Sequence, residues 1–405
     1  MKSIKDLKVE GRRVLVRCDF NVSLDEEGGI VDDLRLRQAL PTINYLREKK
    51  AKIVLMSHFK EPEKKWRLED EKKEKLSTSI YPIKKRLEQL LESEIFFVGG
   101  CVGREVQEKI NELGEGEILL LENVRAYEEE KEASEDFAQE IAKQGDVFIN
   151  DAFSVSHRDH ATVSKIPLFL ESGMGVFFEE ELEILKKLVK NPRQPVVAVV
   201  GGAKVESKIK ALNFFLEEAD HLLLGGKIAN MVLIVRGVAI NLKKPPEEVT
   251  AIVKEMDYTS PKLHLPVDVV TSRDNKGESG VAKKGPGKVE EGEDIYDIGE
   301  ETINLFGDII KNAGTIIWAG PLGLSEVEAF SKGTKSVGRH VIENKEAVKI
   351  VGGGDTLKAF RQFDLIDEID LVSSGGGAML AFITGGAMPG IEALKLNREK
   401  NEKLD

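Results

Sequence analysis

Short apolar runs alternate with longer segments of helical period along most of this chain. The apolar runs of the first half are RRVLVRCDF, KIVLMSH, EIFFVGG, EILLLEN and DVFINDAF, and they are separated by helical segments such as LRLRQALPTINYLREKK and EASEDFAQEIAKQ. A strand buried on both faces of a parallel sheet is apolar throughout, whereas a crossover helix is apolar at every third or fourth position. The alternation therefore predicts a doubly wound α/β domain over residues 1–175.

A second alternating series predicts another parallel-sheet domain over residues 192–385. Its apolar runs are QPVVAVVGGA, HLLLGG, KLHLPVDVV, TIIWAG, AVKIVGGG and DLVSSGGG, and its helical segments include KIKALNFFLEEA and TINLFGDIIKNA. The predicted fold class is α/β, with two doubly wound parallel-sheet domains.

The segment between the two series predicts a single joining helix over residues 176–191. Its apolar residues recur at helical spacing and two prolines follow them, namely Phe177, Leu182, Leu185, Leu188, Pro192 and Pro195. Two charged or glycine-rich segments without periodicity, 60–74 and 272–292, are expected to be exposed loops.

Composition indicates a globular intracellular protein. The chain has 405 residues, of which 41% are hydrophobic, which is enough for substantial cores. Its 59 basic and 71 acidic side chains give a net charge of −12, which disfavours binding to nucleic acid or to an anionic membrane. Cys18 and Cys101 are the only cysteines, and no apolar run approaches the roughly 20 residues of a membrane span. We therefore expect a cytoplasmic protein without a disulfide framework.

Glycines gather where the second series changes from strand to helix. They are Gly201, Gly202, Gly225, Gly226, Gly320, Gly323, Gly352, Gly353, Gly354, Gly375, Gly376 and Gly377. Backbone N–H groups and the helix dipole meet an anion at such turns, because a residue without Cβ lets phosphate approach closely. A single loop more often serves ordinary turn geometry, but several in one domain favour phosphate binding. The chain lacks G-x-x-x-x-G-K-[ST], and no G-x-G-x-x-G opens the first crossover, so a P-loop and a dinucleotide fold are disfavoured.

Charged residues beside these glycines extend the phosphate interpretation. Lys204 and Lys208 lie four residues apart on one helix face, and they form either a solvated basic face or a pair of cations for phosphoryl oxygens. Asp355 directly follows a glycine run, where its carboxylate either holds Mg²⁺ bridged by nucleotide phosphates or caps the helix. The two roles of Asp355 can coexist.

Cationic side chains also lie near predicted strand ends in the first half. They are Arg35, Arg125 and Arg158, together with His58. Guanidinium groups bind phosphate and carboxylate oxygens bidentately, and Asp19 and Asn21 can take hydroxyl groups of the same ligand. Each residue alone also fits a structural role, such as pairing of Arg35 with Asp25 or Asp32. Their coincidence at successive strand ends favours a site for a small, multiply anionic substrate.

An ordered series of segments runs through both halves: VRCDFNVSL, DDLRLRQALPTI, LLENVRAYEEE, NDAFSVSHRDHAT, GGAKVESKI, LPVDVV, DIGEET, WAGPLG, VGGGDT, SSGGGAML and MPGIEAL. In this order they resemble the phosphoglycerate kinase family. The resemblance implies two domains that face each other across a cleft, with residues 386–405 returning to pack on the first. It also implies reversible phosphoryl transfer between 1,3-bisphosphoglycerate and Mg-ADP, giving 3-phosphoglycerate and ATP. We expect a monomer with these small molecules as partners. We also expect a hinge closure that lets the two clefts meet, with a static spacer as the alternative role of the joining helix.

The resemblance also assigns site residues. The triose site comprises Asp19, Asn21, Arg35, His58, Arg125 and Arg158. The nucleotide site comprises Gly202, Lys204, Lys208, Gly226, Glu326 at the ribose hydroxyls, Gly353, Gly354, Thr356, and Asp355 at Mg²⁺. Arg35 and Lys204 are expected to neutralise the phosphoryl group during its transfer, while the loops at Gly353 and Gly376 donate N–H groups to it. Such a transfer needs positioning and charge neutralisation more than acid or base catalysis.

Several positions depart from the family pattern, chiefly in the triose half. Glu61, in SHFKEP, stands where the family has an arginine, an exchange that can weaken triose binding by roughly one to three decades if the side chain faces the ligand. Lys64, Lys65 or Arg67 is a candidate for compensation. Asp159 adds an acid beside the groove.

Three functions therefore compete. The first is an active phosphoglycerate kinase with a rearranged triose loop. The second is a non-catalytic nucleotide-binding relative with a degraded triose site, and the third is a kinase for another small carboxylate. Retention of the arginines and of Lys204 favours chemistry, whereas Glu61 and Asp159 argue against unaltered triose affinity.

Overall fold

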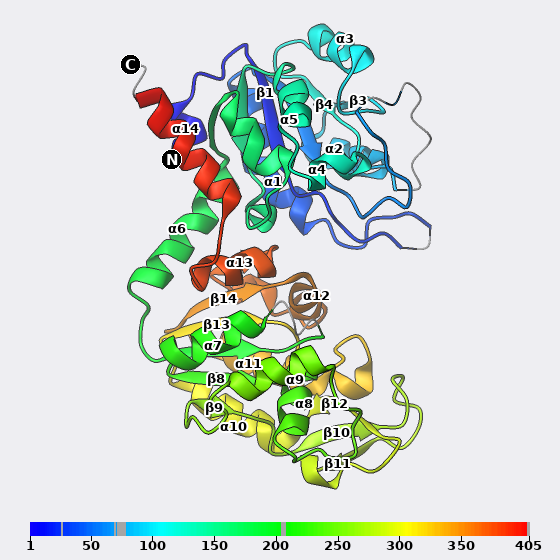
Figure 1. Ribbon diagram of the computed structural model, residues 1–405, viewed down its shortest axis with the longest axis vertical. Helices are drawn as coiled ribbons and strands as arrows, with labels where there is room; N and C mark the ends of the chain where they lie inside the picture. Colours follow the sequence, from blue (N-terminus) through cyan, green and yellow to red (C-terminus); the bar gives the residue numbers. More distant parts are fainter. Residues whose placement is uncertain (26, 69, 71–77, 204–207, 403–405) are drawn as a thin grey trace. The chain divides into compact units, whose positions relative to one another are not determined.

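The computed structural model describes residues 1–25, 27–68, 70, 78–203 and 208–402, and the chain divides into two compact units. Unit 1 comprises Met1–Glu183 and Ala387–Asp405, and unit 2 comprises Ile184–Gly386. Helix α6 (Val176–Lys190) runs from one unit into the other (Figure 1). Its buried apolar face begins at Phe178, whereas the spacing predicted Phe177.

Unit 1 is built on a six-stranded parallel sheet with the order β3-β4-β2-β1-β5-β6. Its strands are β1 (Arg13–Cys18), β2 (Lys52–Ser57), β3 (Phe96–Phe97), β4 (Ile118–Leu120), β5 (Val147–Asn150) and β6 (Glu171–Met174). Its α-helices are α1 (Leu34–Glu48), α2 (Tyr81–Leu91), α3 (Arg104–Glu112), α4 (Glu128–Lys131), α5 (Glu135–Ala142) and α14 (Pro389–Glu402). Short helical turns are η1 (Ile4–Asp6), η2 (Val124–Ala126), η3 (Phe153–Val155), η4 (Ala161–Lys165) and η5 (Ile166–Leu168).

Alternating side chains of β1 show why this sheet is apolar throughout. Val14 and Val16 belong to one buried apolar cluster and Leu15 belongs to another. Both faces of the sheet are therefore covered, as the continuous apolar runs predicted. Strands β2, β3 and β4 lie on one side of β1, and the later strands β5 and β6 lie on its other side, so the strand order reverses at β1. Ligands of open parallel sheets bind at the carboxyl ends of strands around such a switch point.

Unit 2 contains a second six-stranded parallel sheet, with the order β15-β14-β13-β7-β8-β9, and a three-stranded sheet β11-β10-β12. The strands of the large sheet are β7 (Val196–Val200), β8 (His221–Leu224), β9 (Leu263–His264), β13 (Thr315–Ala319), β14 (Val348–Gly352) and β15 (Leu371–Ser373). The small sheet comprises β10 (Val269–Ser272), β11 (Ala282–Lys284) and β12 (Asp294–Ile298). The helices are α7 (Ile209–Glu218), α8 (Gly226–Val235), α9 (Glu247–Glu255), α10 (Glu300–Lys311), α11 (Lys332–Glu343), α12 (Gly354–Gln362) and α13 (Gly376–Ile383), with turns η6 (Pro286–Lys288), η7 (Glu328–Phe330) and η8 (Ile366–Glu368).

The small sheet corrects the expectation that 272–292 is an exposed loop. β11 and η6 lie inside that segment, and β11 pairs antiparallel with β10 from Val269↔Lys284 to Thr271↔Ala282. β11 is a short edge strand with two lysines, which is a common way to protect a sheet edge. Such a strand has no alternation of apolar and polar residues, so the sequence pattern could not reveal it.

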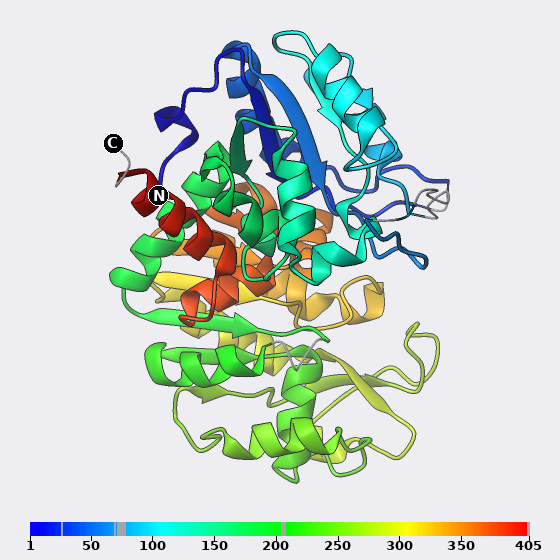
Figure 2. The same cartoon turned by 45° about the horizontal axis from the view of Figure 1, so that its top comes forward.

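The last described helix, α14, packs on unit 1, beside η4, η5 and β6 (Figure 1 and Figure 2). Asn397 makes this contact specific. Its side-chain oxygen accepts from Ser172 N at 3.0 Å, and its amide donates to the carbonyls of Pro167 at 2.7 Å and Leu170 at 2.8 Å. Across the described part of the chain, no helix combines the length and apolarity needed to cross a membrane.

Candidate functional site

The carboxyl ends of the central strands of unit 1 carry a cluster around Asp19. Asp19 follows β1, and Arg35 Nη1, from the first turn of α1, lies 2.9 Å from its carboxylate. The same guanidinium nitrogen donates to the carbonyl of Asn21 at 3.0 Å, and Asn21 N donates to Asp19 Oδ1 at 3.1 Å. Ser154 Oγ, in the turn after β5, donates to Asp19 Oδ2 at 2.5 Å. Three predicted residues are thus brought together, and Ser154 joins them.

Asp19 is buried yet held ionised. Burial alone would raise its pKa, but the charge of Arg35, the neighbouring His58 and the hydrogen bonds from Ser154 Oγ and Asn21 N outweigh that effect and lower the pKa. The carboxylate therefore stays an acceptor at neutral pH, which suits it to orient a hydroxyl group or a cationic side chain.

Two further predicted arginines, Arg125 and Arg158, lie near one another. Burial and the charges of Arg158 and Arg17 together lower the pKa of Arg125 to about 10. Among the described residues, Arg125 Nε is buried without a hydrogen-bond partner. Arg158 is exposed, and its Nε lies 3.4 Å from His157 Nε2. Like charges that crowd together in this way favour an anionic ligand between them.

Glu61 is the internal counter-ion of this basic cluster. Its carboxylate lies 2.7 Å from Lys65 Nζ, 3.2 Å from Lys131 Nζ and 4.0 Å from Arg125 Nη1. Burial would raise the pKa of Glu61, but its hydrogen bonds with Lys65 and Lys131 lower it. Lys131 was not among the residues expected to offset Glu61, because it lies 70 positions away in sequence.

Of the expected compensating residues, Arg67 is engaged elsewhere. Its guanidinium contacts Glu128, and Nη1 lies 2.8 Å from Glu132 Oε2. Asp159 is likewise engaged locally, since it accepts from Ser164 Oγ at 2.5 Å and pairs with Lys165 at 3.0 Å. The added charge of Asp159 is therefore balanced by its neighbours.

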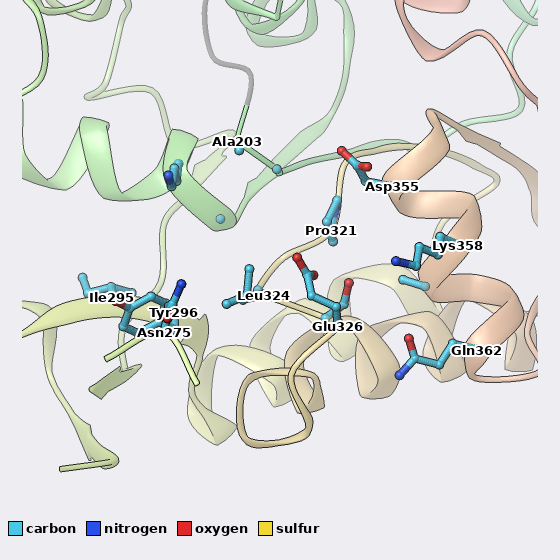
Figure 3. A pocket seen from close by; sticks show the side chains of 16 residues that line it. Ala203, Asn275, Ile295, Tyr296, Pro321, Leu324, Glu326, Asp355, Lys358 and Gln362 are labelled. Atoms are coloured by element: carbon cyan, nitrogen blue, oxygen red, sulfur yellow. The ribbon is translucent and has the colours of Figure 1, made fainter. Parts of the chain in front are cut away.

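Unit 2 contains a pocket of about 260 Å³ at the carboxyl ends of its strands (Figure 3). Its lining residues are Gly202, Ala203, Gly226, Lys227, Asn275, Ile295, Tyr296, Pro321, Gly323, Leu324, Ser325, Glu326, Asp355, Lys358, Ala359 and Gln362. Four of the predicted nucleotide residues are in this set, namely Gly202, Gly226, Glu326 and Asp355. Figure 3 shows the Glu326 carboxylate on a loop and the Asp355 carboxylate at the start of α12.

Glycine is required at the turns around this pocket. Gly202 and Gly353 have φ values of +85° and +100°, which side chains rarely adopt. Gly376 is needed for a different reason, because a Cβ there would lie 2.6 Å from the Cα of Gly353. The two predicted N–H loops, at Gly353 and Gly376, are therefore packed directly against each other.

The other predicted nucleotide residues that the structure describes lie beside the pocket. Lys208 Nζ donates to the carbonyl of Gly201 at 2.5 Å. Thr356 is buried, and its hydroxyl accepts from Gly320 N at 2.7 Å and donates to Gly352 O at 3.0 Å, so it ties two glycine turns together. Gly354 is the first residue of α12, and Lys204 lies outside the described residues.

The residues beside this pocket are compatible with Mg²⁺ that is bound to a nucleotide. No group of three or more His, Cys, Asp or Glu side chains suited to a metal occurs in the described ranges. Asp355 is exposed at the edge of the pocket. One carboxylate together with phosphate oxygens and water is a common environment for Mg²⁺.

Sequence reasoning missed several lining residues. Lys358 lies one helical turn after Asp355 on α12, so helical spacing could have placed both on one face. Asn275 and Tyr296 come from the small sheet region, which the pattern did not predict. Lys227 lines the pocket directly after Gly226.

Two α/β units, each built on a parallel sheet, define the class of this protein. One carries a cationic cluster at its strand ends and the other a glycine-lined pocket, which is typical of proteins that bind phosphorylated small molecules.

Comparison with known proteins gives the family. The family profile described as Phosphoglycerate kinase matches residues 4–386. Phosphoglycerate kinases of Borrelia hermsii and Coprothermobacter proteolyticus are 38% and 40% identical, covering 98% and 97% of this chain and 99% and 98% of the relatives. The chain belongs to the phosphoglycerate kinase family.

Solved structures of the family are similar as well. The phosphoglycerate kinase of Pyrococcus horikoshii has a TM-score of 0.87 at 28% identity, covering 99% of this chain and 100% of that one. The enzyme of Coxiella burnetii has a TM-score of 0.79 at 33% identity, covering 98% and 99% respectively.

Proposed function

We propose that this protein transfers a phosphoryl group reversibly between 1,3-bisphosphoglycerate and Mg-ADP, giving 3-phosphoglycerate and ATP. The observation that carries the proposal is the crowding of Arg125 with Arg158 and Arg17, in which Arg125 Nε is buried without a hydrogen-bond partner among the described residues. Such crowding is costly unless an anion binds between the groups. The names of the relatives support the same substrates.

In this proposal the residues of unit 1 bind the triose. Arg125 and Arg158 neutralise its anionic groups, and Arg35, oriented by Asp19, faces the phosphoryl group that is transferred. His58 and Asn21 contribute polar contacts beside Asp19. No covalent intermediate is required, because an acyl phosphate needs only in-line positioning and charge neutralisation for transfer.

The residues of unit 2 bind the nucleotide in this proposal. Glu326 binds the ribose hydroxyls, and the N–H groups at Gly353 and Gly376 donate to the phosphates. Asp355 would hold Mg²⁺, which when bound to the nucleotide supplies positive charge at its phosphate oxygens. Lys204 and Lys208 add cationic groups at the same turn. Transfer then requires that the bound triose and nucleotide be brought together by a closure of the two units.

An assay of ATP formation from ADP and 1,3-bisphosphoglycerate, with nucleotide binding measured by calorimetry, tests the proposal. Turnover supports a phosphoglycerate kinase. Binding without turnover supports a non-catalytic relative, and turnover only with another acyl phosphate supports a different carboxylate kinase. Mg²⁺ removal with a chelator is expected to abolish turnover.

Lys204→Ala tests the role given to this lysine. We expect it to abolish turnover while it preserves much of the nucleotide affinity, because the charge is needed most in the transition state. Lys243→Ala, an exposed lysine of the same unit, is the control. Full activity of Lys204→Ala would reject the assignment. Sedimentation of the purified protein tests the further proposal that it is a monomer, and fractionation of cells tests the cytoplasmic location.

A further inference from the structure

Arg17 is a buried cation beneath the triose cluster. It lies on β1, its side chain has no exposed surface, and its Nη1 donates to the carbonyl of Cys18 at 2.5 Å. Its Nε donates to Thr162 Oγ1 at 2.8 Å. Since arginine stays protonated in proteins, these contacts hold a permanent positive charge at a defined position.

Glu130 compensates this charge through Thr162. The carboxylate has no exposed surface, and it accepts from Thr162 N at 2.9 Å and from Thr162 Oγ1 at 2.7 Å. The Thr162 hydroxyl uses its only proton toward Glu130 and therefore accepts from Arg17. Arg17 Nη2 also lies 3.8 Å from Glu130 Oε1. A buried network with each donor assigned to an acceptor has little freedom to rearrange.

The Nη2 group of Arg17 also reaches His58. It lies 3.4 Å from His58 Nδ1. A guanidinium has donors only, so Nδ1 can take part in this contact only as an acceptor without a proton. Burial lowers the pKa of His58 well below its usual value, and Arg17, Arg125 and Arg35 add to this effect while Asp19 opposes it. A neutral ring with a bare Nδ1 carries its proton on Nε2.

The other edge of the His58 ring points to the site. Its Nε2 lies 3.9 Å from Asp19 Oδ1, the carboxylate that Arg35 contacts. We propose that Arg17 is a positioning residue that holds His58 in the Nε2–H tautomer, so that the ring presents a hydrogen-bond donor in the triose site. A donor suits a carboxylate or hydroxyl oxygen of an anionic ligand, whereas the other tautomer would present a lone pair. The inference rests on the proposed function only for the identity of that ligand.

The tautomer can be observed directly in the wild-type protein. In a ¹⁵N spectrum of the imidazole nitrogens at neutral pH, we expect an unprotonated Nδ1 and a protonated Nε2 for His58, assigned by the loss of its signals in His58→Gln. A protonated Nδ1 would overturn the proposal. Because the spectrum needs no substrate, this outcome is independent of whether the protein turns over 1,3-bisphosphoglycerate.

Variants then link the tautomer to binding. Arg17→Met combined with Glu130→Gln removes the donor without leaving a buried carboxylate unpaired, and we expect a mixture of His58 tautomers. The Kd for 3-phosphoglycerate should rise about two- to tenfold, while that for ADP should stay unchanged. The single variant Arg17→Lys keeps one cationic donor, so its His58 signals should remain closer to those of the wild type than the signals of the double variant.

Arg13→Met is the matched control, because Arg13 lies on the same strand and pairs with Asp146 instead. Its His58 signals and 3-phosphoglycerate affinity should equal those of the wild type. A folded double variant that keeps the wild-type tautomer would overturn the role of Arg17. If the double variant does not fold, the wild-type spectrum and Arg17→Lys still decide the question.

Discussion

Two buried carboxylates, Asp19 in unit 1 and Asp297 in unit 2, lie beside the two candidate sites and differ in their partners. Asp19 faces Arg35, His58 and the hydroxyl of Ser154. Asp297 accepts only backbone hydrogen bonds among the described residues, from Ile298 N at 2.9 Å and Gly333 N at 2.7 Å.

The electrostatic consequence is opposite in the two units. The pKa of Asp19 is lowered because the Arg35 cation and the hydrogen bonds from Ser154 and Asn21 outweigh its burial. Burial raises the pKa of Asp297 to about 8, because its two backbone N–H donors do not outweigh the burial. The candidate site of unit 1 thus contains buried side-chain charges. The pocket region of unit 2 contains backbone groups and close-packed glycines, and its buried acid is kept neutral.

Among the substitutions that test this contrast, removal of a charge from unit 1 should have the largest effect. Arg35→Ala takes away the cation nearest Asp19, and we expect kcat/KM for the triose to fall about 100-fold, as for loss of a charge-assisted hydrogen bond to the reacting group. Arg37→Ala is the control, because Arg37 lies two positions further on α1 and pairs with Asp33. Steady-state kinetics of both variants measure the difference. An equal loss of kcat/KM in both variants would mean that the loss comes from a disturbed α1 and not from the missing charge of Arg35.

Adding one carbon to the glycine packing of unit 2 should have the next largest effect. In Gly376→Ala the new Cβ meets the backbone of Gly353, and we expect a loss of about 1–3 kcal/mol in the free energy of unfolding together with a higher KM for ADP. Gly285→Ala places its Cβ in open space and should change neither quantity. Denaturant unfolding and ADP titrations measure the two effects. A stable Gly376→Ala with normal ADP affinity would contradict the close packing.

The contrast between the carboxylates predicts a pH dependence. Because the folded-state pKa of Asp297 is about 8, well above the 3.8 of an unperturbed aspartate, the folded protein holds a proton that the unfolded chain releases between these values. Stability is therefore lost as the pH rises from about 4 to about 8, by at most roughly 1.4 kcal/mol per pH unit from this group.

Asp297→Asn should flatten this dependence, since the amide does not titrate. Urea unfolding at several pH values, for the wild type and Asp297→Asn, measures the slope. Asp308→Asn, an exposed acid of α10, is the control and should leave the slope unchanged. An unchanged slope in Asp297→Asn would show that Asp297 is ionised in the folded protein.

The smallest effect is expected at Glu61. Glu61→Gln removes the negative charge that Lys65 and Lys131 face, so KM for 3-phosphoglycerate should fall about two- to fivefold at low salt and less at high salt. Glu61→Arg should shift KM in the same direction. Glu132→Gln, which affects Arg67 instead, is the control. An unchanged KM would mean that Glu61 does not act on the ligand.

The sequence predicted those parts of the molecule that depend on local periodicity. Both parallel sheets follow from apolar runs, and the positions of Asp19 and Gly202 follow from the ends of those runs. Local periodicity could not predict the contact of Glu61 with Lys131, because Lys131 lies on α4, in the connection between β4 and β5. Asn275 and Tyr296 were missed for a similar reason, since the small sheet that brings them to the pocket has no clear period.

The hydrogen bonds of Asn397 to the backbone of Ser172, Pro167 and Leu170 also bear on how the protein is made. Unit 1 is completed by helix α14, and Asn397 of this helix is synthesised 225 residues after Ser172, to which it is hydrogen-bonded. The nascent first unit must therefore wait, incomplete, while the whole of unit 2 is synthesised. Premature termination before Ala387 would release a chain in which the later unit can be finished but the earlier one cannot.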